Sequence, residues 1–123
     1  MKKVIITGGN SGIGYQAAKQ LAENGWSVTL FCRRKEAAEQ ACEKIRQQTG
    51  NPHVDYILVD LSEMKSVRKA AEQYIQKEET LDVLMNNAAD FDLSVKKPIL
   101  SKDGVEKQFA TNVVAPFLLS TLL

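Results

Sequence analysis

A short apolar segment that runs directly into a glycine-rich turn constrains the fold of this chain most. Residues 3–7 read Lys-Val-Ile-Ile-Thr, and the next seven, Gly8 to Gly14, include four glycines. A continuous β-branched run is typical of a strand buried on both faces of a parallel sheet. Because glycine lets the backbone turn sharply, the pattern predicts a first strand and a tight turn into a helix.

Strand-like and helix-like segments alternate along the rest of the chain. The predicted strands are 3–7, 27–32, 54–59 and 81–85, and the predicted helices are 13–24, 35–48, 62–77 and 103–123, the last with Pro116 inside it. Ser62 is expected to cap the third helix by accepting a hydrogen bond from a free N–H group. The alternation predicts an α/β fold of the Rossmann type, a doubly wound parallel sheet with helices on both faces. The sheet is expected to be incomplete, with about four strands in the order 3-2-1-4.

Composition excludes several classes of function. Sixteen basic and fifteen acidic residues give a formal net charge of +1, so a nucleic-acid partner is not expected. No stretch approaches the roughly 20 apolar residues that span a membrane, and no signal peptide is recognisable, so we expect a cytoplasmic protein. Cys32 and Cys42 lack metal-ligand spacing, and His53 is the single histidine, so no metal site is expected.

The position of the glycines, between a strand and a helix, suits a phosphate group. Such a turn lets the backbone approach a pyrophosphate, whose charge meets the free N–H groups at the helix start. A P-loop is excluded because Tyr15 and Gln16, not Lys and Ser/Thr, follow Gly14. The six-residue G-x-G-x-x-G pattern does not fit, and a phosphoryl receiver domain would have acidic residues where Thr7 and Gly8 stand. A glycine turn without a ligand is the remaining alternative.

The end of the second predicted strand bears on the choice of cofactor. In dinucleotide-binding folds an acidic residue here binds the ribose hydroxyls of NAD, but this chain reads Cys32-Arg33-Arg34. Two guanidinium groups and no carboxylate favour a 2′-phosphate, and hence NADP over NAD. The alternative is a solvated arginine pair at the start of a helix.

Four motifs in this order resemble the short-chain dehydrogenase/reductase superfamily, and they match the N-terminal half of a member. They are Thr7-Gly8-Gly9-Asn10-Ser11-Gly12-Ile13-Gly14, Asp60-Leu61, Asn86-Asn87-Ala88-Ala89 and the helix-borne Asn112. Ala89 departs from the glycine of the family motif. Two segments are most similar to the retinol dehydrogenase and protochlorophyllide reductase subgroup of the superfamily. They are the Cys32-Arg33-Arg34 turn and the Asp-Gly-x-Glu-x-Gln-Phe pattern of residues 103–109, which precedes Asn112.

The resemblance implies an NADP-dependent oxidoreductase that moves a hydride between the cofactor and a small carbonyl or alcohol substrate, and a homo-oligomer for the full-length protein. It implies a catalytic role for Asn112, whose backbone carbonyl would hold a water of the proton relay. A helix Asn with only local hydrogen bonds is the alternative. The implied cofactor-binding residues are Gly8, Asn10, Ser11, Gly12, Ile13, Gly14, Arg33, Arg34, Asp60, Leu61, Asn87 and Ala88. Asn86 is expected to stabilise the sheet, and a local capping role is the alternative.

The catalytic Tyr and Lys of the family are expected well downstream of Asn112, beyond these 123 residues. Tyr15 and Lys19 have the right spacing but lie directly after the glycine turn, where the family does not place that pair. We therefore expect residues 1–123 to be the N-terminal portion of a Rossmann domain, inactive by itself. The fourth strand is expected to have an unpaired edge. The last helix is expected to expose the apolar side chains of Val113, Val114, Phe117 and Leu118. A short, non-catalytic nucleotide-binding or regulatory module is the alternative.

Overall fold

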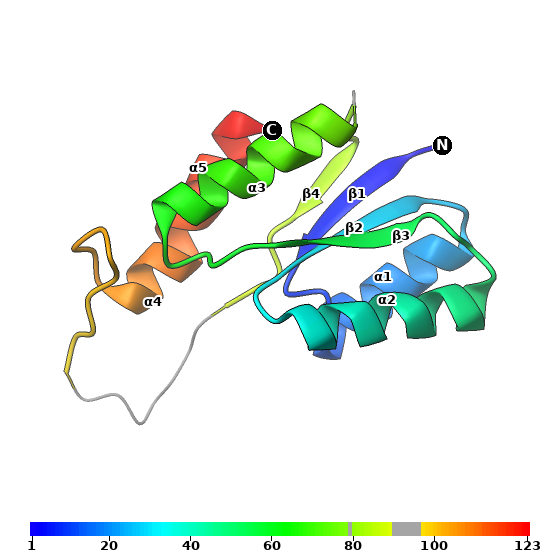
Figure 1. The fold of residues 1–123 in the computed structure, drawn as a ribbon, viewed down its shortest axis with the longest axis horizontal. Coiled ribbons are helices and arrows are strands. Elements are labelled where there is room, and N and C mark those ends of the chain that lie inside the picture. Colours follow the sequence, from blue (N-terminus) through cyan, green and yellow to red (C-terminus); the bar gives the residue numbers. More distant parts are fainter. Residues whose placement is uncertain (79, 90–96) are drawn as a thin grey trace.

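The computed structural model describes residues 1–78, 80–89 and 97–123. Four strands form one parallel sheet in the predicted order β3-β2-β1-β4 (Figure 1). They are β1 (Lys3–Thr7), β2 (Ser27–Cys32), β3 (Val54–Leu58) and β4 (Val83–Met85). Thr7 lies opposite Phe31 in the β1–β2 register, so the carboxyl ends of these strands meet at one edge of the sheet.

Helices cover both faces of the sheet, which confirms the doubly wound architecture (Figure 1). Helices α1 (Gly12–Glu23) and α2 (Lys35–Thr49) cover one face, and α3 (Met64–Lys77) and α5 (Ala115–Leu122) cover the other. In β1, Val4 and Ile6 belong to the core under α1 and α2, while Ile5 belongs to the core under α3 and α5. All three side chains are fully buried, as the β-branched run predicts.

The start of α3 differs from the prediction, because Ser62 is not its cap. The helix begins at Met64, and the Ser62 hydroxyl instead donates to Asp60 Oδ1 at 2.6 Å. The backbone N–H of Met64 donates to Asp103 Oδ2 at 2.8 Å. A carboxylate from a distant segment thus takes the place that the sequence suggests for a local hydroxyl.

The last helical segment begins at Lys107, not at the predicted Asp103. Residues 101–105 form a turn that Gly104, with φ of 74°, completes, and the Glu106 carboxylate then caps the helix by accepting from the N–H of Phe109 at 2.7 Å. A short α4 (Lys107–Phe109) and a π-helical η1 (Ala110–Val114) precede α5. Pro116 has no N–H for an α-helical bond, and the wider π turn before it accommodates this.

The two expectations about exposed apolar surface are confirmed in part. Strand β4 lies at a sheet edge, and Val83 in it is exposed. On the last helix Val113 and Phe117 are exposed, as predicted, but Val114 is half-buried and Leu118 packs against the core under α3 and α5. Residues 90–96, between β4 and the last helical segment, lie outside the described residues. No helix in the described ranges is long and apolar enough to cross a membrane.

Candidate functional site

A cavity of about 340 Å³ lies where the carboxyl ends of the strands meet the last helical segment. One side, which we call the strand-end wall, comes from the segments that follow β1 to β4. The other side, the helical wall, consists of Lys107 and Thr111. Six residues that the resemblance assigns to the cofactor line this cavity: Gly8, Asn10, Arg33, Asp60, Leu61 and Ala88.

Two glycines of the turn are required by close packing. Gly8 has a φ of 65°, and a Cβ there would lie 3.0 Å from atoms of Ala88. A Cβ on Gly14 would lie 2.8 Å from the Gly8 carbonyl oxygen and closer still to the Asn87 amide. The turn after β1 therefore packs directly onto the segment after β4, and a side chain at either glycine would push them apart.

Gly12 and the start of α1 are open by contrast. Gly12 has a φ of 59°, and a Cβ there would meet nothing within 4 Å. The N-cap residue Ser11 makes no capping hydrogen bond with its side chain, and the first turn of α1 holds no acidic residue. The N–H groups and positive dipole end of α1 thus face a space that an anionic group such as a pyrophosphate fits. Ile13 is 83% exposed beside it.

Thr7 joins the turns that follow β1 and β4. Its hydroxyl oxygen accepts from the backbone N–H groups of Asn87 and Ala88, each at 3.0 Å. The Asn87 side-chain amide donates back to the carbonyl oxygens of Thr7 and Gly8 at 3.2 and 3.3 Å. Asn86, which was expected to stabilise the sheet, is exposed, and Asn87 makes these contacts instead. These hydrogen bonds hold together the turns after β1 and β4, which both belong to the strand-end wall.

Three charged side chains line the cavity: Arg33, Asp60 and Lys107. Partial burial alone would raise the pKa of Asp60, but hydrogen bonds from the Ser62 hydroxyl and N–H and the charges of Arg33 and Lys107 outweigh it. The net effect lowers the Asp60 pKa from 3.8. Asp60 is therefore ionised at neutral pH, and both cations lie close enough to influence it.

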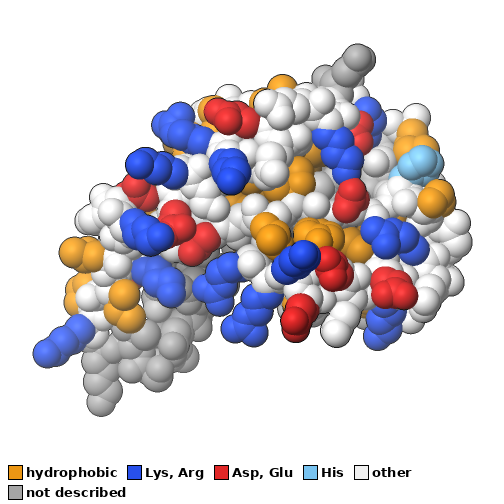
Figure 2. All heavy atoms as spheres, in the orientation of Figure 1, with side chains coloured by type: hydrophobic (Ala, Val, Ile, Leu, Met, Phe, Trp, Pro, Cys, Tyr) orange, Lys and Arg blue, Asp and Glu red, His pale blue; other side chains and the backbone are white. Residues whose placement is uncertain are grey.

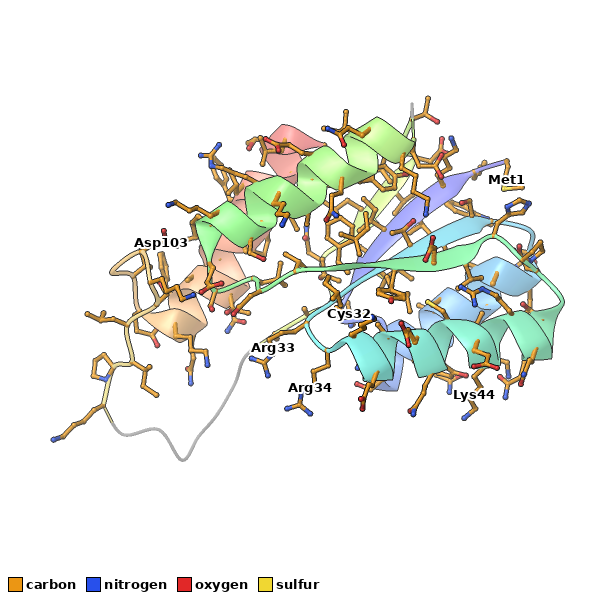
Figure 3. All side chains as sticks on the ribbon, viewed as in Figure 1. Met1, Cys32, Arg33, Arg34, Lys44 and Asp103 are labelled. Atoms are coloured by element: carbon orange, nitrogen blue, oxygen red, sulfur yellow. The ribbon has the colours of Figure 1, made fainter. Side chains whose placement is uncertain are left out.

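Cys32 lies in the strand-end wall but is not a nucleophile. Cys32 is buried in the core under α1 and α2, whereas Arg33 and Arg34 project from the end of β2 (Figure 3). Burial raises the pKa of the Cys32 thiol to about 11, although backbone hydrogen bonds from Gly9 and Asn10 oppose the shift. The thiol is thus protonated and inert at neutral pH.

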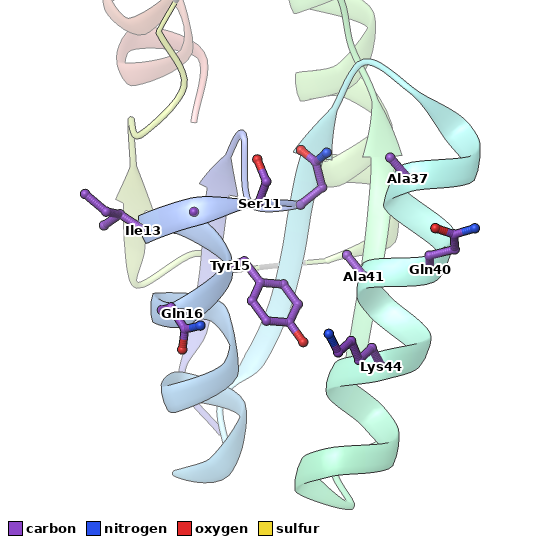
Figure 4. A pocket seen from close by; sticks show the side chains of 10 residues that line it. Ser11, Ile13, Tyr15, Gln16, Ala37, Gln40, Ala41 and Lys44 are labelled. Atoms are coloured by element: carbon purple, nitrogen blue, oxygen red, sulfur yellow. The ribbon is translucent and has the colours of Figure 1, made fainter.

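Some residues of the predicted set lie outside this cavity. Arg34 is the N-cap residue of α2 and lines a separate hollow on that helix. Ser11, Gly12 and Ile13 line a second cavity of about 660 Å³ between α1 and α2 (Figure 4). Asn112 lies in η1 next to Thr111 and is half-buried. Asn87 and Gly14 do not line the cavity, and they hold the turn after β1 against the segment after β4.

The second cavity holds Tyr15, the first member of the Tyr-x-x-x-Lys spacing. Its hydroxyl donates to Gln48 of α2 at 3.3 Å, and the Lys44 ammonium lies 5.6 Å from its ring centroid (Figure 4). These contacts join α1 to α2 on the outer side of the glycine turn. They give Tyr15 a packing role and place it outside the cavity that Arg33 and Asp60 line.

The sequence does not predict the helical wall. Lys107 and Thr111 are four residues apart and so share one side of a helical segment, but the sequence alone does not show which side meets the strands. That placement depends on the Asp103 contact with α3 and on an ion pair of 2.9 Å between Lys102 and Glu63. Within the described residues, no cluster of His, Cys, Asp or Glu could hold a metal ion.

Comparison with known proteins agrees with this geometry. A family profile described as "short chain dehydrogenase" matches residues 2–123. Retinol dehydrogenase 13 from Mus musculus is 44% identical over 123 residues, which cover 99% of this chain and 36% of that protein. Dehydrogenase/reductase SDR family member 12 from Bos taurus is 44% identical over 119 residues, 97% of this chain and 36% of the relative. The chain thus spans about a third of the length of these relatives.

Solved structures share the fold. A crystal structure of an uncharacterized protein from Mycobacterium Paratuberculosis superposes with a TM-score of 0.83 at 33% identity, over 100% of this chain and 41% of that one. The RhlG/NADP active-site complex from Pseudomonas aeruginosa gives a TM-score of 0.80 at 28% identity, over 99% of this chain and 46% of the other. The latter structure contains NADP.

Proposed function

The chain belongs to the short-chain dehydrogenase family, and from this premise we propose that its cleft binds NADPH for a short-chain oxidoreductase acting on a carbonyl or alcohol substrate. One observation carries the proposal: the turn after β1, Arg33 after β2 and Asp60-Leu61 after β3 line one cavity at the carboxyl ends of parallel strands. In open α/β sheets this edge is where nucleotides bind.

Groups in and beside the cleft suit different parts of the cofactor. The open N-terminus of α1 at Gly12, which lines the neighbouring cavity, suits the pyrophosphate. Arg33 in the cleft itself suits a 2′-phosphate, because a guanidinium forms paired hydrogen bonds with phosphate oxygens. Asp60 has its Oδ1 engaged by Ser62, and its second oxygen suits the adenosine. When bound, the nicotinamide would supply or accept the hydride of the reaction. Arg34, Ser11, Ile13, Asn87 and Ala88 remain predicted contributors.

We expect cofactor binding without turnover for the 123 residues alone. The only Tyr-x-x-x-Lys spacing in the sequence, Tyr15 to Lys19, lies on α1, where Tyr15 contacts α2. Asn112 alone does not exchange a proton with a substrate, so an acid/base pair must come from elsewhere. Measurable oxidation of NADPH by this chain with any carbonyl substrate would contradict the expectation.

Arg33→Ala tests the choice of cofactor. We expect the affinity for NADPH to fall about thirtyfold or more, because a charged hydrogen-bond partner of the 2′-phosphate is lost. The affinity for NADH should change little, since NADH lacks that phosphate. Titration by calorimetry measures both, with Arg68→Ala on the exposed side of α3 as the matched control. Equal losses for the two cofactors would refute an NADP preference.

The cytoplasmic location and the homo-oligomer are further proposals. Relatives of this chain include proteins named "chloroplastic" from Brassica napus. Fractionation of the source cells with an antibody against this chain tests the location, and recovery in an organelle fraction would refute the cytoplasm. Light scattering on the full-length protein tests the oligomer, and a monomeric mass would refute it.

A further inference from the structure

The helical wall adds a second cation to the proposed cofactor cleft. Lys107 lines the same cavity as Arg33 and Asp60 but comes from the opposite side, at the start of α4. Its charge also contributes to the lowered pKa of Asp60, in keeping with their place in one cavity. Two positive charges from segments more than seventy residues apart in the sequence therefore flank one carboxylate.

Neither cation forms a close ion pair within the part of the chain that the structure describes. Within residues 1–78, 80–89 and 97–123, the ion pairs at 4.0 Å or less involve Lys3, Lys35, Lys77 and Lys102, and neither Arg33 nor Lys107. Asp60 is the acidic residue of the cavity, and one of its oxygens already accepts two hydrogen bonds from Ser62. Among the described lining residues, two cations thus accompany a single carboxylate.

The backbone and the preceding turn position Lys107. On the face drawn in Figure 2, Lys and Arg side chains lie over α3 and α4 and toward the start of α2, with acidic side chains between them. The backbone N–H of Lys107 donates to the Ile99 carbonyl at 2.6 Å, and Asp103 and Lys102 hold the preceding turn to the start of α3. Lys107 is therefore held at the cavity by its backbone, and its half-buried side chain is available to a ligand.

We propose that Lys107 is a second cofactor-specificity residue, which attracts the 2′-phosphate of NADPH from the helical wall while Arg33 binds it from the strand-end wall. The inference rests on the proposed function and extends it, because preference for the phosphorylated cofactor is then shared by two walls. Lys107 acts as a point charge at the rim, whereas Arg33 offers paired donors. The contribution of Lys107 is therefore smaller than that of Arg33 and more sensitive to salt.

Lys107→Gln tests the proposal, with Lys69→Gln on the exposed side of α3 as a control with the same change in net charge. We expect Lys107→Gln to weaken NADPH about three- to tenfold in low salt, to leave NADH within twofold, and to lose most of this difference near 0.5 M NaCl. Lys107→Arg should retain the preference. Thermal unfolding of each variant shows that the fold is kept.

Other outcomes separate this inference from the proposed function. Unchanged NADPH affinity in Lys107→Gln, or equal losses for NADPH and NADH, would overturn the role of Lys107 while the cleft still binds its cofactor. Failure of the unmodified protein to bind either dinucleotide would instead overturn the proposed function. Competition by 2′-AMP and 5′-AMP gives a second readout, and we expect Lys107→Gln to weaken 2′-AMP alone.

Discussion

The two walls of the cleft are built in different ways. The strand-end wall is fixed by neighbours within the sheet, where the Thr7 hydroxyl and the Asn87 amide join the turns after β1 and β4. The helical wall rests on side-chain contacts between exposed segments, the Asp103 carboxylate with Met64 and Lys102 with Glu63. Breaking a buried hydrogen bond costs more free energy than breaking an exposed ion pair, because it leaves a donor or acceptor without a partner away from water. We therefore expect the strand-end wall to be the stiffer one.

The largest effect should follow from Gly14→Ala in the strand-end wall. The added Cβ would lie 2.8 Å from the Gly8 carbonyl oxygen, so the two turns must separate. We expect the free energy of unfolding to fall by about 2–3 kcal/mol, measured by urea denaturation. Gly12→Ala is the matched control: its Cβ is free, and its positive φ alone costs about 1 kcal/mol. Equal losses in the two variants would mean that packing is not the cause.

Thr7→Val should have the next largest effect. The residue is 2% exposed, and its hydroxyl accepts the N–H groups of both Asn87 and Ala88. Valine keeps the shape but leaves both donors unpaired, so we expect a loss of about 2 kcal/mol in urea denaturation. Thr7→Ser retains the hydroxyl and should lose clearly less. A loss as large in Thr7→Ser would assign the effect to the methyl group.

Asp103→Ala probes the helical wall and should cost less. It removes the acceptor for the Met64 N–H, an interaction of about 1 kcal/mol at a helix start. Hydrogen exchange should accelerate at the start of α3 and in the turn before α4, with β1 and β2 unchanged. Ser62→Ala is the comparison, since it is the cap that the sequence suggests. Faster exchange throughout the sheet would show that the helical wall is not a separate unit.

The smallest effect is the pH dependence contributed by Asp60. Its folded pKa is lower than its unfolded value, so the ionised form stabilises the native state. This contribution is complete above the unfolded pKa near 4 and is lost as the pH falls through the folded pKa. NMR titration of the carboxyl carbon should show the low pKa, and Ser62→Ala should raise it. An Asp60 pKa at or above 4 would contradict the hydrogen bonds to Ser62.

The strand-end wall could be predicted from local sequence, but the helical wall could not. The β-branched run at Val4 to Ile6 and the glycines after it specify a buried strand and a turn whatever surrounds them. The position of Lys107 depends on a contact between Asp103 and Met64, which are 39 residues apart. The residue type of Ser62 predicts a cap, yet Asp60, two residues away, competes for its hydroxyl.

The π-helical turn η1 makes the end of the chain sensitive to length as well as to residue type. Its widened turn holds one residue more than an α-helical turn would. Deletion of a single residue between Ala110 and Val114 would restore an α-helical path and rotate everything after it by about 100°. Ala115 and Leu119, now buried against the α3 side of the core, would turn away from it. A gap in an alignment at this place would therefore signal a repacked helix, even where every flanking residue is unchanged.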